Sequence, residues 1–256
     1  MKNMAFLPER YRVLDGFGLK WIAVISMLID HFGSIVMDGM LAPYKVDGTI
    51  FFTADMPFLV RNAMAIKDVC DILGSVAFPI FCFLVGEGFV HTHNRLKYGA
   101  LVGAFALLSE IPFDLAHYQT WCCFTMQNVL FTLCIGIFTL YAIGLIEDKW
   151  TAVTASRVAL TAAAVIAGGA LAYLVRGEYV FLGVLAMSLF YLLRNSWWRF
   201  AAFAPLMVAS PWALAAAVPL LLYNGKRGRG SKYFFYVFYP AHFLVFWGVA
   251  QLLAHR

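Results

Sequence analysis

The chain has 256 residues, of which 62% are hydrophobic and only 13% are charged, and its formal net charge is +5. Soluble domains are about half apolar and about a quarter charged. A soluble fold of this size could not bury so much apolar surface, so the composition excludes an ordinary soluble protein and indicates a chain covered by lipid. The basic residues fall mostly in short gaps between apolar runs, which is typical of membrane-protein loops, and no nucleic-acid partner is expected.

Apolar runs predict eight transmembrane α-helices, because a helix needs roughly 20 mostly apolar residues to cross a bilayer. The runs cover residues 19–37, 73–90, 101–111, 129–146, 152–175, 180–193, 200–223 and 234–253. The sequence therefore predicts an all-α, multi-pass membrane protein with a single transmembrane domain over residues 1–256. Segment 38–71 is expected to be a long first loop, with a re-entrant or interfacial piece at 50–60.

Basic residues near the expected helix ends indicate which side of the membrane each loop occupies. Arg10, Arg12 and Lys20 favour a cytoplasmic N-terminus. Eight crossings would then place the basic loop 226–232 outside, against the rule. Two explanations stay open: the proline-rich run 200–223 is a hairpin of two half-helices, or the number of crossings elsewhere is wrong by one.

Ionisable side chains inside the apolar runs are candidate functional groups, because a charge at the bilayer centre costs roughly 2.5–3.5 kcal/mol on insertion scales. Asp30 and His31 lie inside the first run. Neighbours on a helix point about 100° apart, so these two are not expected to form a simple hydrogen-bonded dyad. We expect a chemical role for His31; the alternative is a structural polar contact between helices.

A second polar group closes the second apolar run. Glu87 lies between two glycines, which let a helix or a ligand approach the backbone closely, and it is four residues from His91. This spacing allows a carboxylate–imidazole pair on one helix face; the alternative is a solvated helix end. Arg95 and Lys97, in the following loop, can hold the phosphates of a nucleotide-like cofactor, although lipid headgroups would suit them equally.

Three further polar residues lie in apolar surroundings. Glu110 comes just before Pro112, where the third helix is expected to break, and irregular backbone at that depth is tolerated only where it is buried in protein or lines a cavity. Asn128 begins the fourth run, where it can cap a helix or donate to an oxyanion. His242 follows a proline in the last run, with either a structural hydrogen bond or an active-site role.

Five segments, in order along nearly the whole chain, contain most of these polar residues. They are Leu-Asp-Gly-Phe-Gly-Leu-Lys at 14–20 running into Met-Leu-Ile-Asp-His at 27–31, Ala-Phe-Pro-Ile-Phe-Cys-Phe-Leu-Val-Gly-Glu-Gly at 77–88, Ser-Glu-Ile-Pro-Phe-Asp-Leu at 109–115, Gln-Asn-Val-Leu-Phe-Thr-Leu at 127–133 and Tyr-Val-Phe-Tyr-Pro-Ala-His at 236–242. Together they resemble the TraX family, whose namesake acetylates the N-terminus of conjugative F-type pilin. The chain departs from the family near Ser75, where the family usually has an arginine; if that arginine helps to hold the cofactor, Arg95 or Lys97 would have to compensate.

The resemblance implies acetyl-CoA as the donor, an amine or hydroxyl as the acceptor, and no metal. The catalytic residues that it implies are His31, Asp30, His242, Glu110, Asn128 and Tyr239. A histidine would act as general base, a carboxylate would orient it, and the amide or the phenol would stabilise the oxyanion. Donor binding is expected from Glu87, His91, Thr92, Arg95, Lys97 and Tyr98. Direct transfer is the hypothesis, and a covalent acetyl-histidine is the alternative.

The same resemblance implies a multi-pass protein of the bacterial cytoplasmic (inner) membrane, in contact with lipids. Its acceptor would be a protein, a glycan or a lipid, such as a pilin N-terminus or a cell-surface polymer. Two other classes stay open. In a non-catalytic transporter or channel, Asp30, Glu87 and Glu110 would form a proton or substrate path. In a lipid-binding or assembly scaffold, substituting these residues would affect no chemistry.

Overall fold

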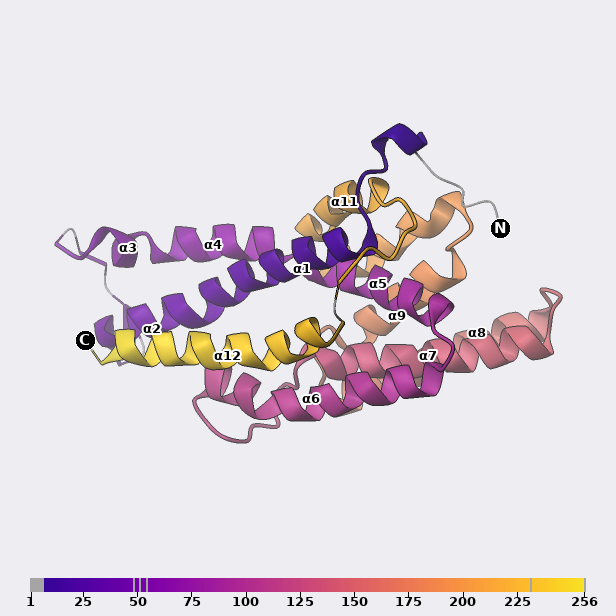
Figure 1. The fold of residues 1–256 in the computed structure, drawn as a ribbon. Helices are drawn as coiled ribbons and strands as arrows, with labels where there is room; N and C mark the ends of the chain where they lie inside the picture. Colours follow the sequence, from indigo (N-terminus) through magenta and orange to yellow (C-terminus); the bar gives the residue numbers. More distant parts are fainter. Residues whose placement is uncertain (1–6, 48, 51, 54, 231, 256) are drawn as a thin grey trace.

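The computed structural model is a bundle of α-helices with one small β-hairpin (Figure 1), and it describes residues 7–255 except 48, 51, 54 and 231. Within the described residues, six helices are long and apolar enough to cross a membrane. They cover Gly16–Tyr44, Ala63–His91, Arg95–Tyr118, Val129–Lys149, Ala155–Val175 and Tyr233–Ala254. The predicted all-α membrane fold is confirmed, but the predicted number of eight spans is not, because two of the expected spans are too short.

The first span consists of consecutive helical pieces. These are α1 (Gly16–His31), the π-helical turn η2 (Phe32–Val36), α2 (Met37–Leu41) and the 3-10 turn η3 (Ala42–Tyr44). Asp15 starts α1, because its carboxylate accepts a hydrogen bond from the Gly18 N–H at 2.8 Å and so satisfies a free donor of the first turn. The span therefore extends beyond residue 37, and the expected long loop at 38–71 is correspondingly shorter.

That loop contains a short antiparallel hairpin and a single helical turn where a re-entrant or interfacial piece was expected. The hairpin pairs β1 (Lys45–Val46) with β2 (Thr49–Ile50), and the turn is α3 (Phe58–Arg61). The second span then begins at residue 63, ten residues earlier than predicted. It combines α4 (Ala63–Gly74) and α5 (Ala77–His91), which are separated by a bend at residues 75–76.

The third span, α6 (Arg95–Tyr118), does not break at Pro112 as expected. A proline removes one backbone donor, but neighbouring helices make it tolerable within a membrane, and the helix continues for six more residues. The N-terminus of α6 is capped by Asn94, whose side chain accepts from the Lys97 N–H at 2.8 Å. As a result His117, which the predicted break would leave in a loop, lies on the same helix as Glu110.

Three antiparallel helices follow, and then a hairpin leads to the last span. The helices are α7 (Val129–Lys149), α8 (Ala155–Val175) and the shorter α9 (Val180–Leu192), and the last span is α12 (Lys232–Ala254). The hairpin contains η4 (Trp197–Ala202), α10 (Phe203–Ala209), η5 (Pro211–Ala216) and α11 (Ala217–Leu221). It reverses at Ser210, whose backbone is extended (φ −151°, ψ 122°).

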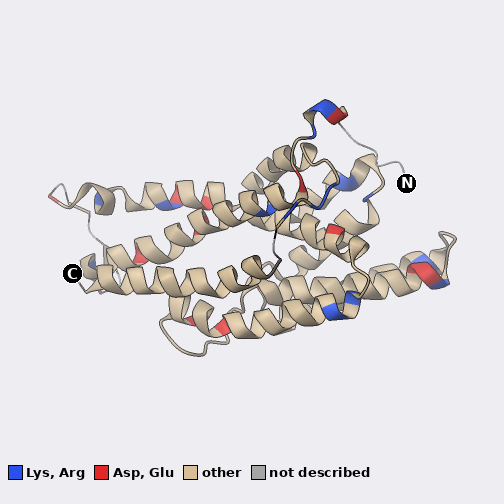
Figure 2. Ribbon diagram, viewed as in Figure 1, with Lys and Arg blue, Asp and Glu red and all other residues tan. Residues whose placement is uncertain are grey.

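The hairpin ends beside the start of α1. The Leu14 N–H donates to the Leu222 carbonyl at 3.0 Å, and the Asn224 N–H donates to the Leu14 carbonyl at 2.8 Å. The hairpin explanation for 200–223 is therefore correct, and the last basic loop shares an end of the bundle with the N-terminus. Figure 2 shows Lys and Arg gathered at this end, which we call the basic end. Such asymmetry is typical of a cytoplasmic face.

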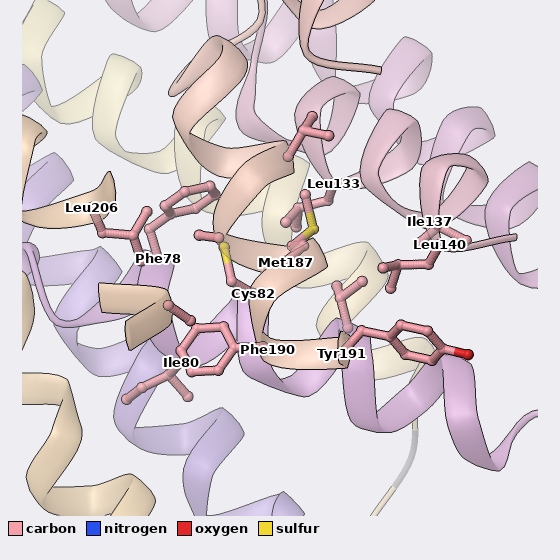
Figure 3. Close-up of a cluster of buried hydrophobic side chains, with 14 of the residues drawn as sticks. Phe78, Ile80, Cys82, Leu133, Ile137, Leu140, Met187, Phe190, Tyr191 and Leu206 are labelled. Atoms are coloured by element: carbon pink, nitrogen blue, oxygen red, sulfur yellow. The ribbon is translucent and has the colours of Figure 1, made fainter. Parts of the chain in front are cut away.

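The main apolar core lies between α5, α7 and α9, with α10 against one side (Figure 3). A second cluster surrounds the middle of α1, α6 and α12 and includes Met27, Phe113, Tyr239 and Phe243. Large side chains also point outward; Leu107 and Leu108 on α6 are 68% and 62% exposed. These outward side chains form the surface that lipid has to cover.

Candidate active site

The centre of the second cluster is a pair of hydrogen-bonded histidines. His31 ends α1, immediately before the π-helical turn, and His242 lies on α12. The His31 Nδ1 and His242 Nε2 atoms are 2.7 Å apart, and the two rings are within 11° of parallel. The residues are 8% and 4% exposed. Two of the predicted catalytic residues, 211 positions apart in sequence, are thus brought into direct contact.

The hydrogen bonds around this pair determine which ring nitrogen is free. His242 Nδ1 lies 3.3 Å from the Phe238 carbonyl, and a carbonyl only accepts, so His242 Nδ1 carries the proton and Nε2 of the neutral ring accepts. His31 must therefore donate through Nδ1. This arrangement leaves a lone pair on His31 Nε2, which is the nitrogen that can remove a proton.

Asp30 lies beside this free nitrogen without bonding to it. Its Oδ2 atom is 3.9 Å from His31 Nε2, which is too long for a hydrogen bond, in agreement with the expectation for helix neighbours. Gly74 of α4 makes room for this carboxylate, because a Cβ there would lie 2.2 Å from Asp30 Oδ1. Ser26 holds the two helices together by donating to the Leu73 and Gly74 carbonyls at 2.5 and 3.1 Å.

A third histidine completes the cluster, and sequence reasoning missed it. The ring of His117 is 5.9 Å from that of His31, nearly perpendicular to it, and Phe243 packs against all three imidazoles. His117 Nδ1 is 3.2 Å from the Phe113 carbonyl one turn earlier. The signal was present in the sequence, but the predicted helix break at Pro112 removed it from consideration.

Glu110 and Asn128 contact each other rather than the histidines. The Asn128 amide donates to the Glu110 carboxylate and, at 2.9 Å, to the Ala106 carbonyl, while its oxygen accepts from the Leu130 N–H at 3.1 Å. Asn128 is fully buried and caps α7. Both side-chain N–H groups are occupied, so Asn128 positions Glu110 and the start of α7 and has no free donor for an oxyanion.

Tyr239 and Glu178 bring two further polar groups to this region. Tyr239 packs against the His242 ring at 5.5 Å and is 7% exposed. Glu178, which sequence reasoning missed, lies in the loop between α8 and α9, where Tyr179 and Val180 adopt positive φ values of 60° and 33°. Burial, followed by the charge of Asp30, raises the pKa of Glu178 to about 7.

A cavity of about 310 Å³ opens at the basic end. It is lined by Arg12, Phe83, Gly86, Glu87, Val90, His91, Phe190, Tyr191, Arg194, Asn195, Arg199, Tyr223 and Gly225. Of the six predicted donor-binding residues, only Glu87 and His91 line it. They do not form the carboxylate–imidazole pair considered above: His91 Nδ1 is 2.8 Å from the backbone carbonyl of Glu87, and the Glu87 carboxylate accepts from the Tyr223 hydroxyl at 3.1 Å.

The other four predicted donor-binding residues lie apart from this cavity. Arg95 stacks over the Phe89 ring at 4.7 Å, and the Tyr98 side chain packs against Gly88. Thr92 ends α5, and Lys97 is exposed in the first turn of α6. The cations that line the cavity are instead Arg12, Arg194 and Arg199. Arg12 precedes α1, whereas Arg194 and Arg199 lie together in the segment that follows α9, so no single local motif marks all three.

The matches to known proteins extend over most of the chain. The family model described as TraX protein matches residues 16–250, a range that includes both paired histidines. A relative from Dichelobacter nodosus, named as a probable fimbrial assembly protein, FimC, is 25% identical over 260 residues, covering 89% of this chain and 92% of the relative. No solved structure matches the chain.

Proposed function

This chain belongs to the TraX family, and from that premise we propose that it is a membrane acetyltransferase that moves an acetyl group from acetyl-CoA to an amine or hydroxyl acceptor. The resemblance supplies the donor and the reaction class. The relative's name, a fimbrial assembly protein, favours a pilus-related acceptor such as a pilin N-terminus. The observation that carries the proposal is the buried His31–His242 hydrogen bond, which leaves His31 Nε2 as an available base.

The transfer needs one group that takes a proton and returns it. As the acceptor nitrogen or oxygen attacks the thioester carbonyl, its proton passes to His31 Nε2. The C–S bond then breaks, and the imidazolium returns the proton to the sulfur, so that the products are the acetylated acceptor and free CoA. A positioned general base of this kind typically contributes roughly 10²–10⁴-fold.

The neighbouring residues support this cycle from their observed positions. His242 accepts from His31 Nδ1 and so holds the reactive tautomer, as the orienting partner does in other catalytic groups. The Asp30 carboxylate, 3.9 Å from His31 Nε2, stabilises the imidazolium while it lasts. Tyr239, whose ring packs against His242, is the phenol proposed to stabilise the oxyanion. The basic end would face the cytoplasm of a bacterial inner membrane, where acetyl-CoA is made.

The test is acetyl transfer by the detergent-purified protein from radiolabelled acetyl-CoA, with released CoA thiol measured in parallel. We expect His31→Gln to lose roughly 10²–10⁴-fold in rate, while His93→Gln, an exposed histidine in the loop after α5, keeps the wild-type rate. Equal rates in the two variants would remove the proposed base. A protein that moves a solute without consuming the thioester would be a transporter.

A second experiment identifies the acceptor. Pilins and surface polymers from cells with and without the gene are compared by mass spectrometry for a difference of one acetyl group. A modified pilin N-terminus would assign the pilin, and a modified glycan or lipid would assign a surface polymer instead. No difference in any of these fractions would count against acetyl transfer in the cell.

A further inference from the structure

The cavity at the basic end contains more positive than negative charge. Arg12, Arg194 and Arg199 line it together with a single carboxylate, Glu87. Burial lowers the pKa of Arg199, and Arg199 lines the same cavity as Arg12 and Glu87. Glu147, behind the cavity wall, is shared between Arg157 at 2.9 Å and Arg194 at 3.7 Å. Arg12 also pairs with Glu9 at 3.4 Å, but the Glu9 side chain is 93% exposed, so the cavity lining itself carries an excess of positive charge.

Two of these arginines also have unused donors. The Nε atoms of Arg12 and Arg194 are buried and have no hydrogen-bond partner among the described residues. An unsatisfied buried N–H costs about 1–3 kcal/mol, and more on a charged group. Arginines present N–H groups in a planar fork that matches phosphate oxygens. These buried N–H groups, in a cavity that opens at the basic end, suit a phosphate-bearing ligand.

We propose that this cavity binds the diphosphate of the acetyl donor, with Arg12, Arg194 and Arg199 as its phosphate ligands. The inference rests on the acetyltransferase function proposed above. It replaces Arg95 and Lys97, which sequence reasoning favoured, because neither lines the cavity. The donor would lie with its nucleotide at the basic end and its thioester pointing into the bundle.

The interior wall of the cavity suits the uncharged arm that joins the diphosphate to the thioester. Phe83 forms part of this wall, where its ring meets those of Phe190 and Tyr223 edge-on. Phe78 is five residues earlier on α5, about 7.5 Å further into the bundle. It stacks on Tyr179 with ring centroids 3.7 Å apart.

The test is direct binding by isothermal titration calorimetry on the detergent-purified chain, with coenzyme A, ADP and inorganic pyrophosphate as probes. We expect Arg12→Gln/Arg199→Gln to weaken coenzyme A binding by at least about tenfold, since charge-assisted hydrogen bonds are lost. The control Arg10→Gln/Arg229→Gln removes the same charge from exposed residues of the same end and should change the Kd by less than about twofold. Arg12→Lys keeps the charge without the fork and should be intermediate.

Steady-state kinetics provide a second measurement, which is independent of the direct binding experiment. In the double variant the KM for acetyl-CoA should rise with little change in kcat. Coenzyme A binding equal to wild type, or an unchanged KM in an active double variant, would overturn the phosphate site and leave the acetyltransferase intact. Arginine-dependent binding of coenzyme A without acetyl transfer would support the phosphate site and overturn the proposed acetyltransferase function. Arginine-dependent binding of phosphatidylglycerol nanodiscs, with no binding of coenzyme A, would overturn the proposal in favour of a lipid headgroup.

Discussion

Replacing His242 separates tautomer control from packing. His242→Phe removes the acceptor for the His31 Nδ1–H and keeps a ring of similar volume, in a neighbourhood that already contains Phe238 and Phe243. His242→Gln keeps a carbonyl oxygen that can accept the same proton, but it loses the ring. If His242 acts by orienting His31, glutamine should preserve more activity than phenylalanine. If His242 only fills space, the order should reverse.

The magnitude follows from burial. His31 and His242 are 8% and 4% exposed, so water cannot readily replace the lost acceptor, and an unsatisfied buried donor costs about 1–3 kcal/mol. If the whole of this cost is added to the activation free energy of acetyl transfer, the rate falls about 5- to 150-fold in His242→Phe. We expect the loss in kcat, with the KM for acetyl-CoA nearly unchanged, because the proposed phosphate site lies away from the histidine pair.

The assay is steady-state acetyl transfer at several donor concentrations, with thermal unfolding of each variant measured in the same detergent. Thermal unfolding shows whether a slow variant is merely unfolded. The reasoning is refuted if His242→Phe is folded and as active as wild type, or if it is more active than His242→Gln. Either result would mean that His31 does not need an acceptor at Nδ1.

Two further predictions concern stability. Gly74→Ala should lower the unfolding temperature, because its Cβ would meet Asp30 Oδ1 at 2.2 Å and overpacking typically costs about 1–3 kcal/mol. The control Gly248→Ala, with nothing within 4 Å of its Cβ, should be neutral or stabilising, and equal effects of the two substitutions would contradict this packing. Burial raises the pKa of Glu178 from 4.5 to about 7, so the folded state holds this proton more tightly, and its stabilising effect is present below pH 4.5 and lost as pH rises through 7. Glu178→Gln should therefore lose less thermal stability than wild type between pH 5 and pH 8, and parallel losses would show that this carboxyl does not couple to folding.

The helices of this protein are readable from sequence where they are long and continuous. The predicted runs at 129–146 and 152–175 match α7 and α8 closely, because a bilayer requires a minimum apolar length. The errors occur where polar residues or prolines interrupt a helix that tertiary contacts then sustain. The extension of the first span beyond residue 37, the early start of α4 and the passage of α6 through Pro112 are all of this kind.

The two histidines of the buried pair were predictable from the sequence, but their contact was not. His31 and His242 were identified because polar groups in hydrocarbon are costly, yet nothing in the local sequence shows that they bond to each other across 211 residues. Glu178 was missed because it lies in a short gap that looks like an ordinary loop. Arg12 was interpreted as a topology signal, and only the hairpin's return to the start of α1 brings it and Arg199 around one cavity.

The depth of the histidine pair bears on how the two substrates meet. His31 is the 16th residue of a 29-residue span that starts at the basic end, so it lies roughly 24 Å along a helix of about 44 Å. Acetyl-CoA is too polar to cross a bilayer, whereas pilins and surface polymers are presented on the opposite side. In the proposed mechanism, a base near the middle of the span would allow the acetyl group alone to change sides, with the nucleotide held at the basic end by arginines and the acceptor approaching from the far end. The proposed donor site and the proposed base are thus about half the length of one helix apart, so we expect substitutions in the arginine cavity to alter KM and substitutions at the histidine pair to alter kcat.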